Sequence, residues 1–355
     1  MKNIVIVAGA RPNFVKVAPL IRAIEKRTDA NYQLVYAGRA DDPTLETSLF
    51  EDLQMPHPTH FMGVDSTSLN EITSRVMAQF DDYLDNVPAD VVIVVDDLAS
   101  TMAAAIVTKK RGLKLAHLVA GTRSFNMQMP KEVNRLVIDA LSDYLFTAGV
   151  KSNSVATREQ AEGSNTYMVG NILLDTLRFN YQRFVKPPFQ VNEQEYIVFT
   201  INRKALLADE TKLALLLAAM SRGANGTPII APLRGLAAEV VSKLAASVGA
   251  SITCQAALPY LQFGWLTAHA RGIITDSGNV AEEATFNGVP CITLNSYTEH
   301  QETVTVGTNV LVGEEPQLLE EETRKMVAGN WKKSALPDRW DGRTAERIVQ
   351  ILVND

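Results

Sequence analysis

Basic side chains follow an apolar run near the start of the chain, an arrangement that could hold phosphate groups. The run at residues 4–7 leads into a loop with Gly9, Arg11 and Pro12, and Lys16 follows within a helical stretch. Gly9 permits a tight turn, and Pro12 suits a first helical turn. The free N–H groups of that helix start and the two cations form a plausible anion site. The alternative is a tight turn with solvated cations, and the absent G-x-G-x-x-G spacing gives no specific indication of a dinucleotide.

A second loop of the same kind follows the apolar run at residues 272–275. Ser277, Gly278 and Asn279 offer backbone and side-chain donors at a helix start, which is a phosphate-binding geometry. Glu283, one to two turns further, could accept a hydrogen bond from a ribose hydroxyl. The alternative is a capped helix with an acidic first turn.

Three more loops carry polar groups after short apolar runs. Asp96 and Asp97 are adjacent carboxylates, with a helix cap as their alternative role. Residues 117–123 and 200–204 combine basic and hydrogen-bonding side chains, and Arg135 follows in a helical stretch, where such residues are more often solvated. Five such loops together describe a site for a polyanionic ligand, most simply a sugar nucleotide.

Composition limits the other classes of function. The 355 residues include 46% hydrophobic and 21% charged residues with a net charge of −6, which argues against a general nucleic-acid or anionic-membrane binder. Cys254 and Cys291 lie outside any C-x-x-C pattern, so neither a disulfide framework nor a zinc site is indicated, and the scattered histidines suggest no other metal site. Without a visible signal peptide or an apolar stretch of about 18 residues, a cytoplasmic protein is the simplest interpretation.

Short Val- and Ile-rich runs alternate with amphipathic stretches along the whole chain, which predicts parallel sheets with helical crossovers. The two prolines at residues 186–189 break this series, and a second series starts at residue 196. We therefore predict two doubly wound, Rossmann-like α/β domains, at residues 1–180 and 190–338. The helical segment at 340–355 is expected to pack on either domain. Open parallel sheets bind ligands at the carboxyl ends of their strands, so the loops above are expected to line a cleft between the domains.

Several blocks in this order resemble the non-hydrolysing UDP-N-acetylglucosamine 2-epimerases. The resemblance runs from residue 3 to about residue 313 and is carried by GARPNFVKVAPL, HLVAGTRS, MPKEVNR, MVGNILLD, DSGNVAEEATFNGVPCITL and TVGTNVLVG. It implies the GT-B fold, with the ligand between two Rossmann-like domains and the last helix returning to the first domain. It also implies a homodimer, a role in polysaccharide biosynthesis, and UDP or a UDP-sugar as ligand without a further cofactor.

The resemblance also assigns binding residues. It implies that Arg11 and the segment 277–279 hold the phosphates, that Glu283 holds the ribose, and that the backbone of Phe263 reads uracil. Asn279 stands where the family has a glycine. Lys16 matches the family's active-site lysine, and Arg135 matches the arginine of its P-E-E-x-N-R motif.

The catalytic positions depart from the family pattern. The family reaction removes the C2 proton and expels UDP, and UDP then adds back with C2 inverted. Asp97 matches the family's aspartate, but Val119 and Lys131 stand in place of glutamates and Asn202 in place of a histidine. A positioned acid or base contributes about 10²–10⁴ in rate, so three losses predict little epimerisation unless other groups substitute.

Three residues are candidate substitutes: Asp96, Glu132 and His300. The family's activator-associated G-Q-H element is also changed, to Gly38-Arg39-Ala40. Three functions stay open: an epimerase of the family, a non-catalytic UDP-sugar binder with a regulatory or partner role, and a different reaction such as glycosyl transfer. The last rests on fold analogy alone.

Overall fold

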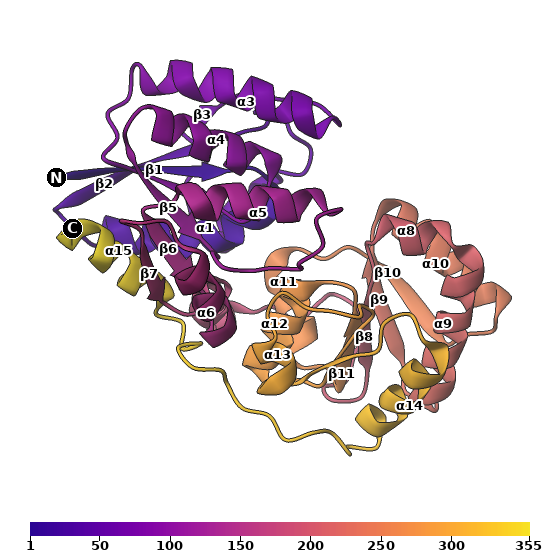
Figure 1. Cartoon of the computed structure of the whole chain (residues 1–355). Coiled ribbons are helices and arrows are strands. Elements are labelled where there is room, and N and C mark those ends of the chain that lie inside the picture. Colours follow the sequence, from indigo (N-terminus) through magenta and orange to yellow (C-terminus); the bar gives the residue numbers. More distant parts are fainter. The chain divides into compact units, whose positions relative to one another are not determined.

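The computed structural model describes all residues from Met1 to Asp355. The chain forms two compact units (Figure 1). Unit 1 comprises Met1–Phe179 and Asp338–Asp355, and unit 2 comprises Asn180–Pro337. Each unit is described by itself below.

Unit 1 is built on a seven-stranded parallel sheet with strand order β3-β2-β1-β4-β5-β6-β7. Its strands are β1 (Lys2–Ala8), β2 (Ala30–Tyr36), β3 (His60–Phe61), β4 (Val91–Val95), β5 (Lys114–Leu118), β6 (Tyr144–Thr147) and β7 (Asn165–Met168). Its helices are α1 (Arg11–Glu25), α2 (Thr47–Leu53), α3 (Leu69–Leu84), α4 (Ala99–Lys110), α5 (Pro130–Leu141), α6 (Val150–Glu159), α7 (Ile172–Asn180, whose last residue belongs to unit 2) and α15 (Thr344–Asn354).

The central strands explain why this sheet is covered on both faces. Every residue of β4 is buried, and β4 pairs in register with β1, with Val5 opposite Val92 and Val7 opposite Val94. A strand that is apolar on both sides must be covered by helices on both sides. The carboxyl ends of β1, β4 and β5 therefore meet at one edge, where their loops emerge.

The C-terminal helix α15 packs against α1 of unit 1, as the yellow helix beside the indigo one in Figure 1 shows. The carboxylate of Asp175 accepts hydrogen bonds from the backbone N–H groups of Thr344 and Ala345 at 3.1 and 2.7 Å. The indole of Trp340 donates to the carbonyl of Ala148 at 2.9 Å. These contacts fix the start of α15 on unit 1.

Unit 2 has a six-stranded parallel sheet with strand order β10-β9-β8-β11-β12-β13. Its strands are β8 (Ile197–Thr200), β9 (Ile229–Leu233), β10 (Ile252–Ala256), β11 (Gly272–Thr275), β12 (Cys291–Thr293) and β13 (Asn309–Leu311). Its helices are α8 (Lys204–Ala208), α9 (Glu210–Ala224), α10 (Gly235–Ser247), α11 (Tyr260–Ala268), α12 (Gly278–Asn287), α13 (Glu302–Thr305) and α14 (Pro316–Val327), with the 3₁₀ turn η1 (Tyr181–Arg183).

Alternate residues of β8 enter different cores of unit 2. Ile197 and Phe199 pack on one face with the helices α9 and α10, while Val198 packs on the other face with Trp265 and Leu266 of α11. The sheet thus has an apolar layer on each side. Its β8 and β11 ends lie side by side, since Thr200 pairs with Thr275.

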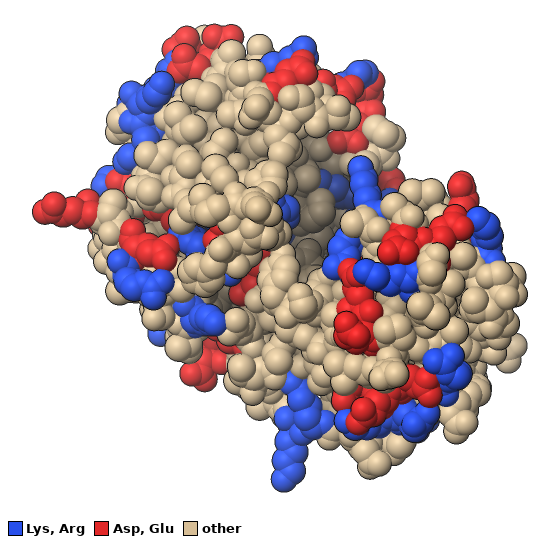
Figure 2. All heavy atoms as spheres, turned by 45° about the vertical axis from the view of Figure 1, so that its right-hand side comes forward, with Lys and Arg blue, Asp and Glu red and all other residues tan.

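The two sheets confirm the prediction of two Rossmann-like α/β domains made from alternating apolar runs. No helix has the combination of length and apolar character that crossing a membrane requires. On the face drawn in Figure 2, acidic and basic side chains are interspersed and neither sign covers an extended area.

Candidate functional site

The loop after β1 is closed by a side chain inside α1. Oδ1 of Asn13 accepts hydrogen bonds from the backbone N–H groups of Gly9 and Ala10, at 2.8 and 3.1 Å. A Cβ added at Gly9 would meet the Ser100 hydroxyl at 2.1 Å and Cδ1 of Leu98 at 2.9 Å, so a larger residue would require both side chains to move. Arg11 opens α1, and its guanidinium lies 3.8 Å from the Glu46 carboxylate. The loop places Arg11 at a helix N-terminus, in the position that the sequence predicted.

Asp96 connects the β1 and β4 loops. Its carboxylate accepts hydrogen bonds from Lys16 Nζ at 2.6 Å and from Asn13 Nδ2 at 2.8 Å. Its backbone is left-handed, with φ of 59°. The alternative role of this pair of aspartates as a helix cap is wrong, because α4 begins after Leu98 and has no side-chain cap. Asp96 instead neutralises the buried Lys16.

Asp97 lies between two cations. Arg135 reaches Oδ2 of Asp97 through Nε at 2.7 Å and Nη2 at 2.6 Å, and Lys131 Nζ lies 3.3 Å from Oδ1. Burial works to raise the pKa of Asp97, but the charges of Lys131 and Arg135 outweigh it and hold that pKa below its usual range. An aspartate held as an anion in this way is a weak base.

Glu132 is committed to the loop that precedes α5. Its carboxylate accepts from the Ser124 backbone N–H and hydroxyl, both at 2.8 Å, from the Phe125 N–H at 3.0 Å, and from Arg135 Nη1 at 3.1 Å. Glu132 is 1% exposed. Burial favours the neutral form, yet the hydrogen bonds from Ser124 and Phe125 lower its pKa. Glu132 therefore holds the 124–125 turn in place and forms an ion pair with Arg135.

Val119 occupies a backbone position that suits glycine. Its φ is 73°, a left-handed conformation that is strained for a β-branched residue.

The strand that precedes Val119 is fixed by His117. Nδ1 of His117 lies 2.5 Å from Asp139 Oδ1, and its Nε2 lies 3.1 Å from the carbonyl oxygen of Asp96. Arg123 binds the other Asp139 oxygen at 2.6 Å. His117 and Asp139 are buried, so this network positions the loops.

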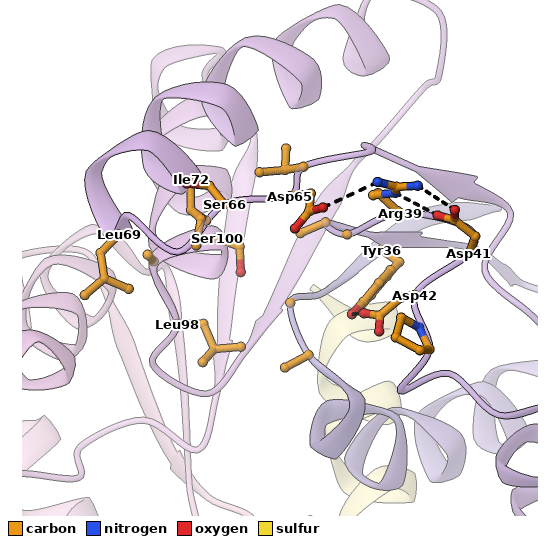
Figure 3. Close-up of a pocket in the computed structure, with 17 residues that line it drawn as sticks. Tyr36, Arg39, Asp41, Asp42, Asp65, Ser66, Leu69, Ile72, Leu98 and Ser100 are labelled. Carbon is orange, nitrogen blue, oxygen red and sulfur yellow. Dashed lines mark hydrogen bonds and ion pairs between the residues drawn. The ribbon is translucent and has the colours of Figure 1, made fainter. Parts of the chain in front are cut away.

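A pocket of about 510 Å³ lies at the same edge of the unit 1 sheet (Figure 3). Arg39 forms ion pairs with Asp41 at 2.5 Å and with Asp65 at 3.4 Å. Asp42 accepts a hydrogen bond from the Tyr36 hydroxyl at 2.7 Å. Of the changed Gly38-Arg39-Ala40 element, Gly38 and Arg39 line this pocket. Three carboxylates and one guanidinium give it an acidic lining, which the separate loops do not reveal in the sequence.

In unit 2, α12 begins with uncapped backbone groups. Ser277 is its N-cap residue, but its side chain makes no capping hydrogen bond, and its own N–H donates to Thr275 Oγ1 at 3.0 Å. The N–H groups of Gly278 and Asn279 therefore have no acceptor in the structure, which is the arrangement that binds an anion at a helix N-terminus.

The loop after β8 is tied to the loop after β11. The Asp276 carboxylate accepts from the N–H groups of Asn202 and Arg203 at 2.8 and 2.6 Å, and the hydroxyls of Thr200 and Thr275 lie 2.7 Å apart. Arg203 is paired with Glu314 at 2.7 Å. The structure thus places Asn202 beside the start of α12.

Glu283 is a buried carboxylate without a partner. It is 7% exposed and makes no hydrogen bond or ion pair. Burial, followed by the charge of the adjacent Glu282, raises its pKa to about 8. Glu282 itself lies 3.5 Å from His300 Nε2. A carboxyl that carries a proton at neutral pH can donate as well as accept a hydrogen bond.

Phe263 lies within α11, where both of its backbone groups are in use. Its N–H donates to the Pro259 carbonyl at 2.9 Å, and its carbonyl accepts from Thr267 Oγ1 at 3.0 Å. The contact with uracil that the resemblance implies for this backbone stays a prediction.

The predicted residues thus fall into two groups. Unit 1 brings Lys16 to Asp96 and brings Asp97 to Lys131, Glu132 and Arg135, while Arg11 pairs with Glu46. Unit 2 gathers Ser277, Gly278, Asn279 and Glu283 on α12 or at its N-cap, with His300 beside Glu282. No cluster of three or more His, Cys, Asp or Glu residues could hold a metal ion.

Comparison with known proteins gives a consistent match along the chain. A family model described as UDP-N-acetylglucosamine 2-epimerase matches residues 22–353. A UDP-2,3-diacetamido-2,3-dideoxy-D-glucuronate 2-epimerase of Pseudomonas aeruginosa is 31% identical over 91% of both chains. A UDP-N-acetylglucosamine 2-epimerase of Methanocaldococcus jannaschii is 30% identical over 98% of both chains.

Solved structures match over the same length. The crystal structure of the M. jannaschii UDP-GlcNAc 2-epimerase in complex with UDP-GlcNAc and UDP has a TM-score of 0.83 and 29% identity, and both chains are covered completely. The Neisseria meningitidis UDP-GlcNAc 2-epimerase has a TM-score of 0.86 at 23% identity, again with complete coverage of both chains, and supports the fold.

Proposed function

Because the chain belongs to the UDP-N-acetylglucosamine 2-epimerase family, we propose that it binds a UDP-sugar through the start of α12 and Glu283. The observation that carries this proposal is the buried, unpartnered carboxyl of Glu283 close behind an uncapped helix N-terminus. Buried polar groups normally have a hydrogen-bond partner, so a ligand that supplies one explains this arrangement.

Each part of the nucleotide has a proposed partner. The N–H groups of Gly278 and Asn279 and the hydroxyl of Ser277 bind the diphosphate, and Arg11 of unit 1 is a further proposed phosphate ligand. Glu283 binds a ribose hydroxyl, and the backbone at Phe263 reads uracil. Helix amides and a guanidinium suit phosphate oxygens because both donate hydrogen bonds and supply positive charge.

We further propose that this binding is accompanied by little or no C2 epimerisation. Proton removal at C2 needs a group that is free to accept the proton and another that returns one. Asp97 is held as an anion by Arg135 and Lys131, and Glu132 is occupied by four hydrogen bonds. Val119 carries no ionisable group. A binder with a regulatory or partner role is the function that fits these contacts best.

A second candidate function is epimerisation by relocated groups, and one contact favours it. Lys16 and Asp96 form a 2.6 Å ion pair at the end of β4, one residue before Asp97. Such a pair could exchange a proton with a substrate, as a catalytic acid and base do. Glycosyl transfer has fold analogy as its support, and transfer to an acceptor glycan would establish it.

The binding proposal is tested by titrating UDP and 2′,3′-dideoxy-UDP into the protein and into the variants Glu283→Met and Glu239→Met. We expect UDP to lose about tenfold in affinity when either the ribose hydroxyls or the Glu283 carboxyl is removed, because methionine has no group that replaces the hydrogen bond and each change deletes the same bond. Removing the ribose hydroxyls and replacing Glu283 together should lower the affinity no more than either change alone. Glu239 is exposed on α10, and its variant is the charge-matched control.

Two results would overturn the assignment. One is UDP binding that is equal in the Glu283→Met and Glu239→Met variants. The other is a ribose-hydroxyl effect that persists in full when Glu283 is replaced, because the hydroxyls would then bind elsewhere.

A further inference from the structure

A groove of about 590 Å³ on unit 1 lies apart from the loops described above. It is formed where one face of α1, the end of α7 and the start of α15 come together, and Figure 1 shows α15 beside α1. Its charged lining residues are Arg22, Lys26, Arg178, Arg343, Asp175 and Glu346. Four cations and two carboxylates give this groove an excess of two positive charges in a chain whose net charge is −6.

Three of these cations have no carboxylate partner. The side chains of Lys26 and Arg343 make no hydrogen bond or ion pair, and the Arg178 side chain donates only to the Asp341 carbonyl at 2.7 Å. Most other arginines with an assigned partner contact Asp or Glu, as Arg27 and Arg75 do. Cations without a carboxylate partner therefore gather at this groove.

The nearest carboxylates are committed to other groups. Asp175 accepts from the first two N–H groups of α15, and its pKa is raised by burial to about 6. Asp341 is paired with Arg347 and accepts from the Arg343 backbone N–H at 3.1 Å. Neither carboxylate neutralises the guanidinium of Arg178 or of Arg343. Glu346 is the one remaining acid in the lining.

The arginines are also held in place. The guanidinium of Arg22 lies 3.9 Å above the ring of Phe179 and donates to the Leu53 carbonyl at 2.8 Å. Gly342 has φ of 70°, and a side chain there would meet Cδ of Arg178 at 2.6 Å. Glycine at this position lets the chain approach Arg178 closely, so the stem of that side chain is confined.

We propose that this groove is a second anion site, which binds a small molecule carrying a phosphate or diphosphate group. Cations brought together without counter-ions repel one another, and an oxyanion with two or more negative charges removes that repulsion. Guanidinium groups bind phosphate through paired hydrogen bonds. A volume of about 590 Å³ lies within the usual range for small-molecule sites.

The site is tested by titrating pyrophosphate into the full-length protein while saturating UDP occupies the proposed nucleotide site. We expect one equivalent of pyrophosphate to bind, and we expect the Arg178→Gln/Arg343→Gln variant to lose about tenfold or more in affinity. The single variant Arg343→Gln removes a guanidinium that has no intramolecular hydrogen bond or ion pair and should show part of that loss with an unchanged melting temperature. The matched control is Arg75→Gln/Arg158→Gln, which removes the same charge from exposed helix positions.

Three results would overturn the proposal: no pyrophosphate binding to the UDP-saturated protein, equal losses in the two double variants, or full affinity in Arg178→Gln/Arg343→Gln. Equal losses would show nonspecific attraction. The test is independent of the nucleotide proposal, because if UDP fails to bind, the comparison of the same variants still reports on this groove.

Discussion

The guanidinium of Arg135 binds the carboxylate of Asp97 through two nitrogen atoms, with Nε at 2.7 Å and Nη2 at 2.6 Å from Oδ2. Its third nitrogen, Nη1, binds Glu132 at 3.1 Å. Arg135 is completely buried, so a single guanidinium forms ion pairs with two acidic side chains inside unit 1, and Lys131 supplies a second positive charge beside Asp97. The two carboxylates are thereby fixed in the ionised state and in position.

Replacing Arg135 with Met should destabilise the protein strongly. The change leaves Asp97 and Glu132 buried without their shared cation, which typically costs about 3–5 kcal/mol. Lys131→Met is the matched control, because its side chain is 56% exposed and a partly exposed ion pair contributes less than about 1 kcal/mol. Urea unfolding measures both, and similar losses in the two variants would contradict this account of Arg135.

The raised pKa of Glu283 predicts a pH-dependent stability. The pKa of Glu283 is about 8 in the folded protein, and the ordinary pKa of a glutamate is 4.5. As the pH rises from 4.5 to about 8, the unfolded chain gives up this proton before the folded protein does, so the folded state loses stability. Glu283→Gln keeps a neutral side chain at every pH. Over this pH range the wild type should therefore lose stability relative to the variant. At pH 8.5 the free energy of unfolding of the variant should be higher by about 1–3 kcal/mol.

Denaturant unfolding of ligand-free protein at pH 5, 7 and 8.5 measures this difference. The exposed Glu239→Gln variant should follow the wild type at all three values. A Glu283→Gln variant that parallels the wild type across the whole range would show that Glu283 is ionised in the folded protein.

Arg11→Ala should weaken UDP binding by about 1–3 kcal/mol, because it deletes a charge-assisted hydrogen bond to a phosphate. The melting temperature of the variant is measured alongside and shows whether the protein stays folded. Arg75→Ala removes an equally charged but distant side chain and should leave UDP affinity unchanged. Unaltered affinity in a folded Arg11→Ala protein would remove the β1 loop from the proposed site.

The triple variant Val119→Glu, Lys131→Glu, Asn202→His should gain detectable C2 exchange. Lys131→Glu replaces a cation 3.3 Å from Asp97 with a carboxylate, and the like charge raises the pKa of Asp97 and makes it a stronger base. Proton NMR with UDP-N-acetylglucosamine in heavy water measures the exchange. A folded, UDP-binding variant without any exchange would show that the loss of activity has further causes.

Much of the fold followed from local sequence pattern. The run at 91–95 is apolar at every position, and it forms the fully buried strand β4. Short strands such as β3, with two residues, and β13, with three, were not identified, because they form through pairing with their neighbours. The loops at strand ends were identified for the same reason as the strands, since the apolar runs stop where the loops begin.

The roles of individual carboxylates required the structure. Asp96 and Glu132 were interpreted as possible acid–base groups, yet Asp96 binds Lys16 and Asn13, and Glu132 binds the 124–125 turn. Those partners lie 80 or 83 residues away for Asp96, and Glu132 reaches back 7 and 8 residues, across the start of α5, to Phe125 and Ser124. Sequence spacing shows which groups are near a strand end, but the hydrogen bonds decide which remain free to react.

The most direct test of the central claim is proton NMR of the wild-type protein with UDP-N-acetylglucosamine in heavy water. The account predicts that the nucleotide-sugar resonances broaden on binding while the C2 proton signal keeps its intensity and no epimer appears. Loss of the C2 signal or growth of the epimer above a heat-inactivated control would contradict it. The chain would then be an active epimerase, and Asp96 and Lys16 would be the residues to replace next.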